Sequence, residues 1–139
     1  MSAEPNRYVL DSFALLVYLE AEPGWLRVKT VLAEAAQNRA EVYLSIINYG
    51  EVIYITERER GLPTAHEVIA TLDRLSIMLV QADRQLTLAA AHIKAHHPIS
   101  YADAFALALA QLKGATLLTG DPEFRKVEHL ANIEWLVEV

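Results

Sequence analysis

The sequence predicts an α/β fold, in which about four to five short strands form a central parallel sheet with helices on both faces. Short apolar runs typical of strands alternate with longer segments whose apolar positions recur at helical spacing. The strand runs are mostly apolar, as expected for strands that crossover helices cover on both faces. A length of 139 residues suits one domain, so residues 1–139 are expected to fold as a single unit.

The boundaries of the elements follow from these runs and from residues that start or stop helices. Strands are expected at residues 7–10, 41–44, 77–80, 115–118 and 133–137. Helices are expected at residues 13–19, 23–35, 46–60, 63–75, 83 or 84 to 97, and 101–113, with a short helix after 122. Ser45 and Gly61 should bound the third helix, and Pro23 should lie in the first turn of the second.

Composition excludes several classes of function. The absence of cysteine excludes disulfides, thiol catalysis and cysteine metal sites, and it indicates the cytoplasm as the compartment. Uncharged runs reach only nine residues, whereas a bilayer span needs about 20 apolar residues, so no membrane association is expected. The formal net charge of −6 argues against nucleic-acid binding through a general basic surface, but it is compatible with an enzyme that holds cations.

The segment from residue 98 to 113 combines an apolar helix with one acidic residue. Both faces of the helix are apolar, so it should be buried nearly all round. Asp103 lies in its first turn, and the spacing Ser100-x-x-Asp103 has the form of a capping box. Capping alone would explain Asp103, so a function can be inferred only if other residues converge on it.

Two further aspartates follow predicted strands. Asp11 comes directly after the first strand, and Asp121 follows the fourth strand and a Thr-Gly turn. Each could simply cap a helix, because Asp is a favoured N-cap and Pro122 suits a first helical position. The carboxyl ends of parallel strands, however, meet at one edge of the sheet, where α/β proteins bind ligands.

Glu51 lies on the same face of the third helix as Ile47 and Ile55, each four residues away. These neighbours favour burial, and a charged side chain is rarely buried unless it is paired or bound to a cation. Arg58, seven residues further along that face, is a distant candidate partner. We favour a functional role for Glu51 over this pairing.

Four carboxylates at one edge of the sheet would repel one another. Two of them about 5 Å apart repel by roughly 3 kcal/mol at an effective dielectric constant of about 20. Such a cluster is partly protonated or binds a cation. Oxygen ligands without cysteine suit Mg²⁺ or Mn²⁺, and these ions hold phosphates and activate water. The residues therefore predict metal-dependent phosphoryl hydrolysis.

The same motifs resemble those of the PIN-domain ribonucleases and, within them, the VapC-type toxins of toxin–antitoxin pairs. The resemblance covers nearly the whole chain and is carried by Asp11-Ser12, by Glu51, by Ile99-Ser100-Tyr101-Ala102-Asp103-Ala104 and by Thr119-Gly120-Asp121-Pro122-Glu123-Phe124. It implies a single PIN-like nuclease domain that hydrolyses RNA phosphodiester bonds by metal-activated water. It also implies a small antitoxin protein as partner, and a homodimer.

The resemblance assigns roles to individual residues. The family's four acidic metal-site positions correspond to Asp11, Glu51, Asp103 and Asp121. The first and third of these would bind the main Mg²⁺ or Mn²⁺ ion, and the other two would complete its surroundings. Ser12 matches a small hydroxyl residue that would hold a water on the ion or cap the helix. Glu123 matches a position that is sometimes acidic and would be peripheral.

Several other side chains have simpler interpretations. His92 and His96 have the i, i+4 spacing of a helical zinc site, but no third ligand is evident, so an exposed helix end is favoured. Trp25, Tyr49 and Tyr54 are expected in the core; the alternative is a groove for an antitoxin helix or stacking on a base.

The basic residues Arg58, Arg60, Arg125 and Lys126 are expected to be solvated, with RNA phosphate contact as the alternative. Two rival functions remain open. One is a non-catalytic PIN-fold binding or scaffold domain, whose acids serve only as helix caps. The other is a different Mg-dependent phosphohydrolase-type α/β domain, although the second acid that such domains carry after the first strand is missing here.

Overall fold

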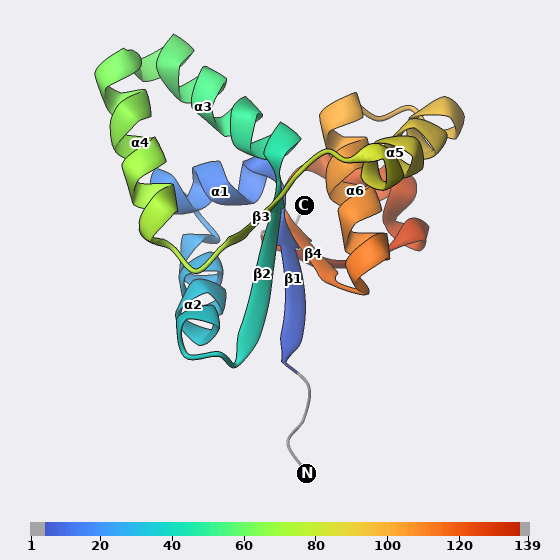
Figure 1. The fold of residues 1–139 in the computed structure, drawn as a ribbon, viewed down its shortest axis with the longest axis horizontal. Helices are drawn as coiled ribbons and strands as arrows, with labels where there is room; N and C mark the ends of the chain where they lie inside the picture. The colour runs from blue at the N-terminus through green and yellow to red at the C-terminus, as the bar shows by residue number, and fades with distance from the viewer. Residues whose placement is uncertain (1–4, 137–139) are drawn as a thin grey trace.

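The computed structural model describes residues 5–136, in which five parallel strands form one sheet (Figure 1). The strands are β1 (Asn6–Leu10), β2 (Ala40–Ser45), β3 (Met78–Val80), β4 (Thr116–Thr119) and β5 (Asn132–Trp135). The helices are α1 (Ser12–Leu19), α2 (Trp25–Ala36), α3 (Ile46–Arg60), α4 (Leu62–Arg74), α5 (Arg84–His96), α6 (Tyr101–Lys113) and the 3₁₀ helix η1 (Pro122–Leu130). None of the helices in this part of the chain is long and apolar enough to cross a membrane. The predicted fold class is confirmed.

The central strands have apolar side chains on both faces of the sheet, whose strand order is β3-β2-β1-β4-β5. In β1, Tyr8 and Leu10 belong to one hydrophobic cluster, whereas Val9 belongs to the other. In β4, Leu117 and Leu118 divide between the clusters in the same way. Because successive side chains of a strand point to opposite faces, a continuous apolar run is buried only if both faces are covered.

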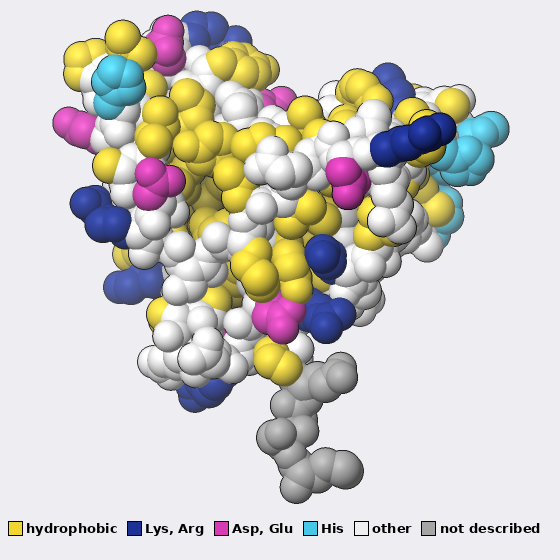
Figure 2. All heavy atoms as spheres, in the orientation of Figure 1, with side chains coloured by type: hydrophobic (Ala, Val, Ile, Leu, Met, Phe, Trp, Pro, Cys, Tyr) yellow, Lys and Arg dark blue, Asp and Glu magenta, His cyan; other side chains and the backbone are white. Residues whose placement is uncertain are grey.

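The two faces are covered by different helices. Residues of α1, α2, α3 and α4 pack on one face, and residues of α5, α6 and η1 pack on the other (Figure 1). In Figure 1, β1 and β2 end near the middle of the molecule, where α3 begins, and Figure 2 shows a hollow above this point, between the two arms of the molecule. We call the ends of β1, β2 and β4, together with the first turns of the helices beside them, the carboxyl edge.

Polar side chains near the strand ends cap the following helices. Five residues accept a hydrogen bond from a backbone N–H of the next helical turn: Asp11, Ser45, Asp83, Ser100 and Asp121. The predicted caps at Ser45 and Ser100 are thereby confirmed. Capping holds each side chain against the start of its own helix, so helix initiation positions several of the polar residues that meet at the carboxyl edge.

The second helix begins later than predicted. It starts at Trp25, and Pro23 lies before it rather than in its first turn. Gly24 has a φ of 101°, in the left-handed region that glycine adopts without strain. A Cβ at Gly24 would lie 2.9 Å from the carbonyl oxygen of Leu136, so the chain passes too close to Leu136 for any residue but glycine. The helix begins only after this left-handed residue.

The C-terminal part differs from the prediction in two details. The helix after Asp121 is a 3₁₀ helix with non-helical backbone angles at Val127. The last strand ends at Trp135, and the predicted end at Val137 lies outside the described residues.

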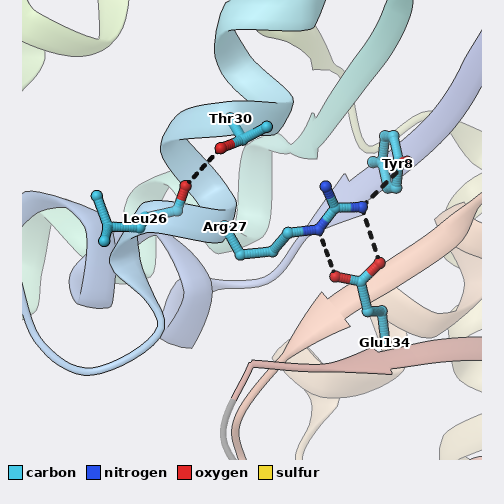
Figure 3. A network of polar contacts seen from close by, with 5 residues as sticks. All are labelled: Tyr8, Leu26, Arg27, Thr30 and Glu134. Atoms are coloured by element: carbon cyan, nitrogen blue, oxygen red, sulfur yellow. Dashed lines mark hydrogen bonds and ion pairs between the residues drawn. The ribbon is translucent and has the colours of Figure 1, made fainter.

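An ion pair joins α2 to the last strand (Figure 3). The Arg27 side chain donates to both carboxylate oxygens of Glu134, at 2.6 and 3.0 Å, and to the Tyr8 hydroxyl at 3.4 Å. Two parallel hydrogen bonds to one carboxylate are the strongest geometry for such a pair. This Arg27–Glu134 clamp therefore fixes β5 and β1 to the helix that covers them.

Candidate active site

Four acidic side chains converge on the carboxyl edge from separate elements. Asp11 follows β1, Asp121 follows β4, Asp103 lies in the first turn of α6, and Glu51 lies in α3. The negative charges of Asp103 and Asp121 raise the pKa of Asp11, and those of Asp121 and Glu51 raise the pKa of Asp103. Such mutual effects require proximity, so the structure brings all four predicted acids into one electrostatic group.

Asp11 is the most buried member of the group, with a relative exposure of 1%. One carboxylate oxygen accepts a hydrogen bond from the Ala14 N–H at 2.8 Å, and the other accepts one from the Thr119 hydroxyl at 2.5 Å. Burial raises the pKa of Asp11 to about 7, and the charges of Asp103 and Asp121 add to this, although the two hydrogen bonds oppose it. Near neutral pH the Asp11 carboxyl is therefore only partly ionised, and a bound cation would displace the proton from the protonated fraction.

Thr119 connects two of the acids and was not among the predicted site residues. Its buried hydroxyl donates to Asp11 and accepts a hydrogen bond from the Asp121 backbone N–H at 3.0 Å. The Thr-Gly-Asp turn after β4 is the signal for it in the sequence. Gly120 completes this turn, because a Cβ there would lie 2.4 Å from the Phe13 ring.

Asp103 occupies the position that the capping-box pattern predicts. Its backbone N–H donates to the Ser100 hydroxyl oxygen at 3.1 Å. Burial raises the pKa of its carboxyl to about 6, helped by the charges of Asp121, Glu51 and Glu123, whereas a hydrogen bond with Ser100 lowers it. The capping role and the electrostatic role therefore coexist in one residue.

Glu51 is half-buried, and it accepts a hydrogen bond from the hydroxyl of Ser12, the buried first residue of α1. Arg58, its distant candidate partner, instead pairs with Glu59 at 3.6 Å and lies over the Tyr54 ring. Ser12 thus orients Glu51 toward α1 without neutralising its charge.

Asp121 and Glu123 lie at the outer part of the edge. The Asp121 carboxylate accepts a hydrogen bond from the Glu123 N–H at 2.9 Å, so it caps η1 as predicted. The Glu123 side chain is exposed and pairs with Lys126 at 2.7 Å. This places Glu123 at the rim of the acidic group.

Within residues 5–136, no basic side chain forms an ion pair with any of the four acids. The ion pairs found there are Arg7–Glu41, Arg27–Glu134, Arg58–Glu59, Arg60–Glu20, Arg125–Glu128 and Lys126–Glu123. The four basic residues expected to be solvated are indeed exposed. The charge of the acidic group is thus compensated only by protonation or by a ligand.

The donor set fits a hard divalent cation. Carboxylate oxygens of Asp11 and Asp103 are the ligand type that Mg²⁺ and Mn²⁺ prefer. Among the described residues, no group of three or more His, Asp or Glu side chains has the geometry of a complete metal site. Mg²⁺ commonly keeps several waters and binds through one or two carboxylates, so a partial protein ligand set suits this ion.

The histidines are not part of this group. The rings of His92 and His96 lie 4.8 Å apart on the exposed surface of α5, in agreement with the predicted exposed helix end. Of the aromatic residues expected in the core, Trp25 and Tyr49 are half-buried, but Tyr54 is 54% exposed, so that prediction is wrong for Tyr54.

A separate groove of about 520 Å³ lies between the α1–α2 and α3–α4 pairs. It is lined by apolar residues such as Leu16, Trp25 and Val68 and by charged residues such as Lys29 and Arg60. None of the four acids lines it. This groove is therefore distinct from the acidic group.

The fold and site define a single-domain α/β protein with uncompensated carboxylates at the carboxyl edge of a parallel sheet. The family model for the PIN domain matches residues 8–130. The chain therefore belongs to the PIN-domain family. A comparison with curated proteins finds no match.

Solved structures share this fold at low sequence identity. A toxin–antitoxin complex from Klebsiella pneumoniae has a TM-score of 0.73 and 13% identity, covering 95% of this chain and 99% of its own. A DNA-bound VapBC from Salmonella typhimurium has a TM-score of 0.74 and 16% identity, with the same two coverages. A sarcin–ricin loop cleaving VapC toxin from Mycobacterium tuberculosis has a TM-score of 0.68 and 18% identity, covering 86% of this chain and 94% of its own.

Proposed function

We propose that this protein is an endoribonuclease that depends on Mg²⁺ or Mn²⁺, and that it is the toxin of a toxin–antitoxin pair. The observation that carries the proposal is the acidic group itself. Four carboxylates meet at the carboxyl edge without an ion-pair partner among the described residues, and two of them have raised pKa values. Carboxylates arranged in this way are stabilised by a divalent cation.

Each residue of the edge has a defined part in this proposal. Asp11 and Asp103 would hold the cation, and Asp121 and Glu51 would complete its surroundings. Thr119 fixes the carboxylate plane of Asp11, since it donates to one oxygen while the Ala14 N–H holds the other. A divalent cation bound here supplies an activated water for attack on phosphorus and stabilises the leaving oxygen.

The assignment to RNA and to a toxin rests on similarity. The structures that share the fold include VapBC complexes and a toxin described as cleaving the sarcin–ricin loop. An antitoxin is therefore the proposed protein partner, and the groove that Trp25 lines is a suitable surface for an amphipathic helix. The proposal includes a homodimer and action in the cytoplasm, and light scattering of the purified protein tests the dimer.

One observation favours a second candidate, a non-catalytic PIN-fold scaffold. Asp11 and Asp121 both cap helices, and Asp103 completes a cap at Ser100, so each has a structural use without a cation. An ionised carboxylate at a helix start is favoured by the helix dipole, which lowers its pKa. Burial and the neighbouring carboxylates instead raise the pKa values of Asp11 and Asp103. The PIN-domain match favours this scaffold over a different phosphohydrolase-type domain.

Cleavage of total cellular RNA tests the proposal. Purified protein with Mn²⁺ or Mg²⁺ should produce discrete fragments that are absent with EDTA and absent with Asp103→Asn. The control is Asp83→Asn, because Asp83 is also a carboxylate at the start of a helix, where it accepts a hydrogen bond from the Leu86 N–H, but it is not among the charges that shift the pKa of Asp11 or Asp103. Cleavage by Asp103→Asn at the wild-type rate would refute the proposal, and folded wild-type protein without activity would favour the scaffold.

A further inference from the structure

Asn48 is a buried polar residue beside the acidic group. It lies in the first turn of α3, three residues before Glu51, and its relative exposure is 0%. Its side-chain amide donates a hydrogen bond to the carbonyl oxygen of Ala102 at 3.2 Å. Ala102 immediately precedes Asp103 in α6, so Asn48 joins the segment that carries one acid to the segment that carries another.

The other half of the Asn48 amide has no partner. Its side-chain oxygen is buried and accepts no hydrogen bond in the described part of the chain. Within residues 5–136 it is the only buried side-chain nitrogen or oxygen atom without a hydrogen-bond partner. An unpaired buried acceptor costs about 1–3 kcal/mol. An apolar side chain of similar shape would avoid this cost, so stability alone gives a poor account of asparagine at this position.

The Asn48–Ala102 hydrogen bond connects two helices that cover opposite faces of the sheet. Among residues 5–136 it is the only hydrogen bond that joins α3 to α6. The two helices cover opposite faces of the sheet and come into contact near the carboxyl edge. Ser12 ties Glu51 to α1, and Asn48 ties the same helix to the start of α6, so together they fix Glu51 relative to Asp103.

We propose that Asn48 is a positioning residue of the acidic site. By holding the first turn of α3 against the first turn of α6, it sets the separation between the carboxylates of Glu51 and Asp103. This inference rests on the proposed function, because the consequence of that separation is the affinity for a divalent cation and the rate of RNA cleavage. The side-chain hydrogen bond of Asn48 is made to Ala102, so Asn48 acts on the site through the two helices.

Substitution of Asn48 separates positioning from stability. Asn48→Leu keeps the branched shape while it removes both the donor and the unpaired acceptor. Asn48→Ala also removes both groups, and it adds no side-chain volume. Both variants should remain folded, with urea midpoints close to wild type. Their Mn²⁺ affinity should fall 10–100-fold, the range for residues that orient metal ligands. The kcat for RNA cleavage should fall with little change in KM, since the contacts to RNA are unaltered.

The matched control is Thr56→Val on the same helix. Thr56 is also buried, but its hydroxyl donates to the Val52 carbonyl of α3 itself at 2.8 Å. This variant should retain wild-type Mn²⁺ affinity and kcat.

Three results would overturn the inference. In the first, both Asn48 variants bind Mn²⁺ and cleave RNA like wild type. In the second, they lose stability while Mn²⁺ affinity and kcat stay unchanged, which is a purely structural role. In the third, the wild-type protein neither binds Mn²⁺ nor cleaves RNA, and the proposed function then falls together with the inference. The first two results leave the proposed function intact, so the two failures are distinguishable.

Discussion

Carboxylates occur in two contrasting regions of this molecule. In the Arg27–Glu134 clamp, the carboxylate receives two hydrogen bonds from a guanidinium, and the pairing raises the pKa of Arg27 above its ordinary value (Figure 3). At the carboxyl edge, Asp11 is more deeply buried but receives only neutral hydrogen bonds, and its pKa rises to about 7. In the clamp, an arginine of the same chain stabilises the negative charge, whereas no basic residue among those described pairs with the acids at the carboxyl edge.

The difference shows which carboxylates are available for a ligand. The clamp satisfies its charge within the chain, so its contribution is to hold β5 in place. The acidic group at the carboxyl edge remains uncompensated although the chain has 12 Lys and Arg residues, several of which pair with acids elsewhere. Charge compensation, rather than the mere presence of acids, therefore distinguishes the candidate site from the rest of the surface.

The largest expected effect concerns cleavage by Asp11→Asn. Removing one charge of the acidic group should lower kcat/KM for RNA on the order of 10³-fold, since a catalytic cation contributes several kcal/mol to the transition state. Glu134→Gln removes a carboxylate from the clamp and should leave kcat/KM unchanged. Equal losses in the two variants, measured on a defined RNA fragment, would remove the distinction between the regions.

The second effect concerns stability in EDTA as a function of pH. Below about pH 3, Asp11 is protonated in both the folded and the unfolded state and does not lower the free energy of unfolding. As the pH rises, the unfolded state ionises first, so stability is lost progressively until the pH exceeds the folded-state pKa of about 7. A rise from 3.8 to about 7 corresponds to at most about 4 kcal/mol by pH 8.

Asp11→Asn cannot ionise and keeps a capping oxygen, so it should be more stable than wild type at pH 8 and similar at pH 4. Urea unfolding at several pH values measures this difference. Mn²⁺ should stabilise only the wild-type protein. A variant less stable than wild type at pH 8 would show that the carboxylate is compensated after all.

The third effect concerns Thr119. Thr119→Val removes the hydrogen bond that orients Asp11 and should lower Mn²⁺ affinity 10–100-fold, as observed for residues that orient metal ligands. Thr119→Ser keeps the hydroxyl and should restore most of that affinity. Calorimetric titration of both variants measures this, and equal affinities for Val and Ser would contradict an orienting role.

The smallest effect concerns the clamp itself. Arg27→Met should lower the free energy of unfolding by about 1 kcal/mol, because both partners are more than a third exposed and solvent screens their attraction. Mn²⁺ affinity and RNA cleavage should not change. Chemical denaturation together with a metal titration measures both, and a large loss of metal affinity would show that the two regions are coupled.

The fold was predictable because its signals are local. Continuous apolar runs, the Ser45 and Ser100 caps and the glycine at position 61 are visible in the sequence, and each has the predicted role in the structure. The start of α2 was not predictable, because it depends on the approach of Gly24 to Leu136, which is distant in the sequence.

The four acids of the site could be proposed from strand ends and helix faces. Ser12 was expected to hold a water or to cap its helix, but in the structure it donates to Glu51, and Asp11 is the cap. Asn48 and Thr119 were not predicted, because they act through partners 54 and 108 residues away. Hydroxyl and amide side chains have many local uses, so their sequence positions alone do not reveal such partners.

Calorimetric titration of Mn²⁺ at pH 6.5 in two buffers of different ionisation enthalpy tests the central claim most directly. With pKa values of about 7 for Asp11 and about 6 for Asp103, binding should release about one proton at pH 6.5 and almost none at pH 8. Asp11→Asn should bind far more weakly and release fewer protons. Binding without proton release at pH 6.5, or equal binding by Asp11→Asn, would contradict the account of the carboxyl edge as a cation site.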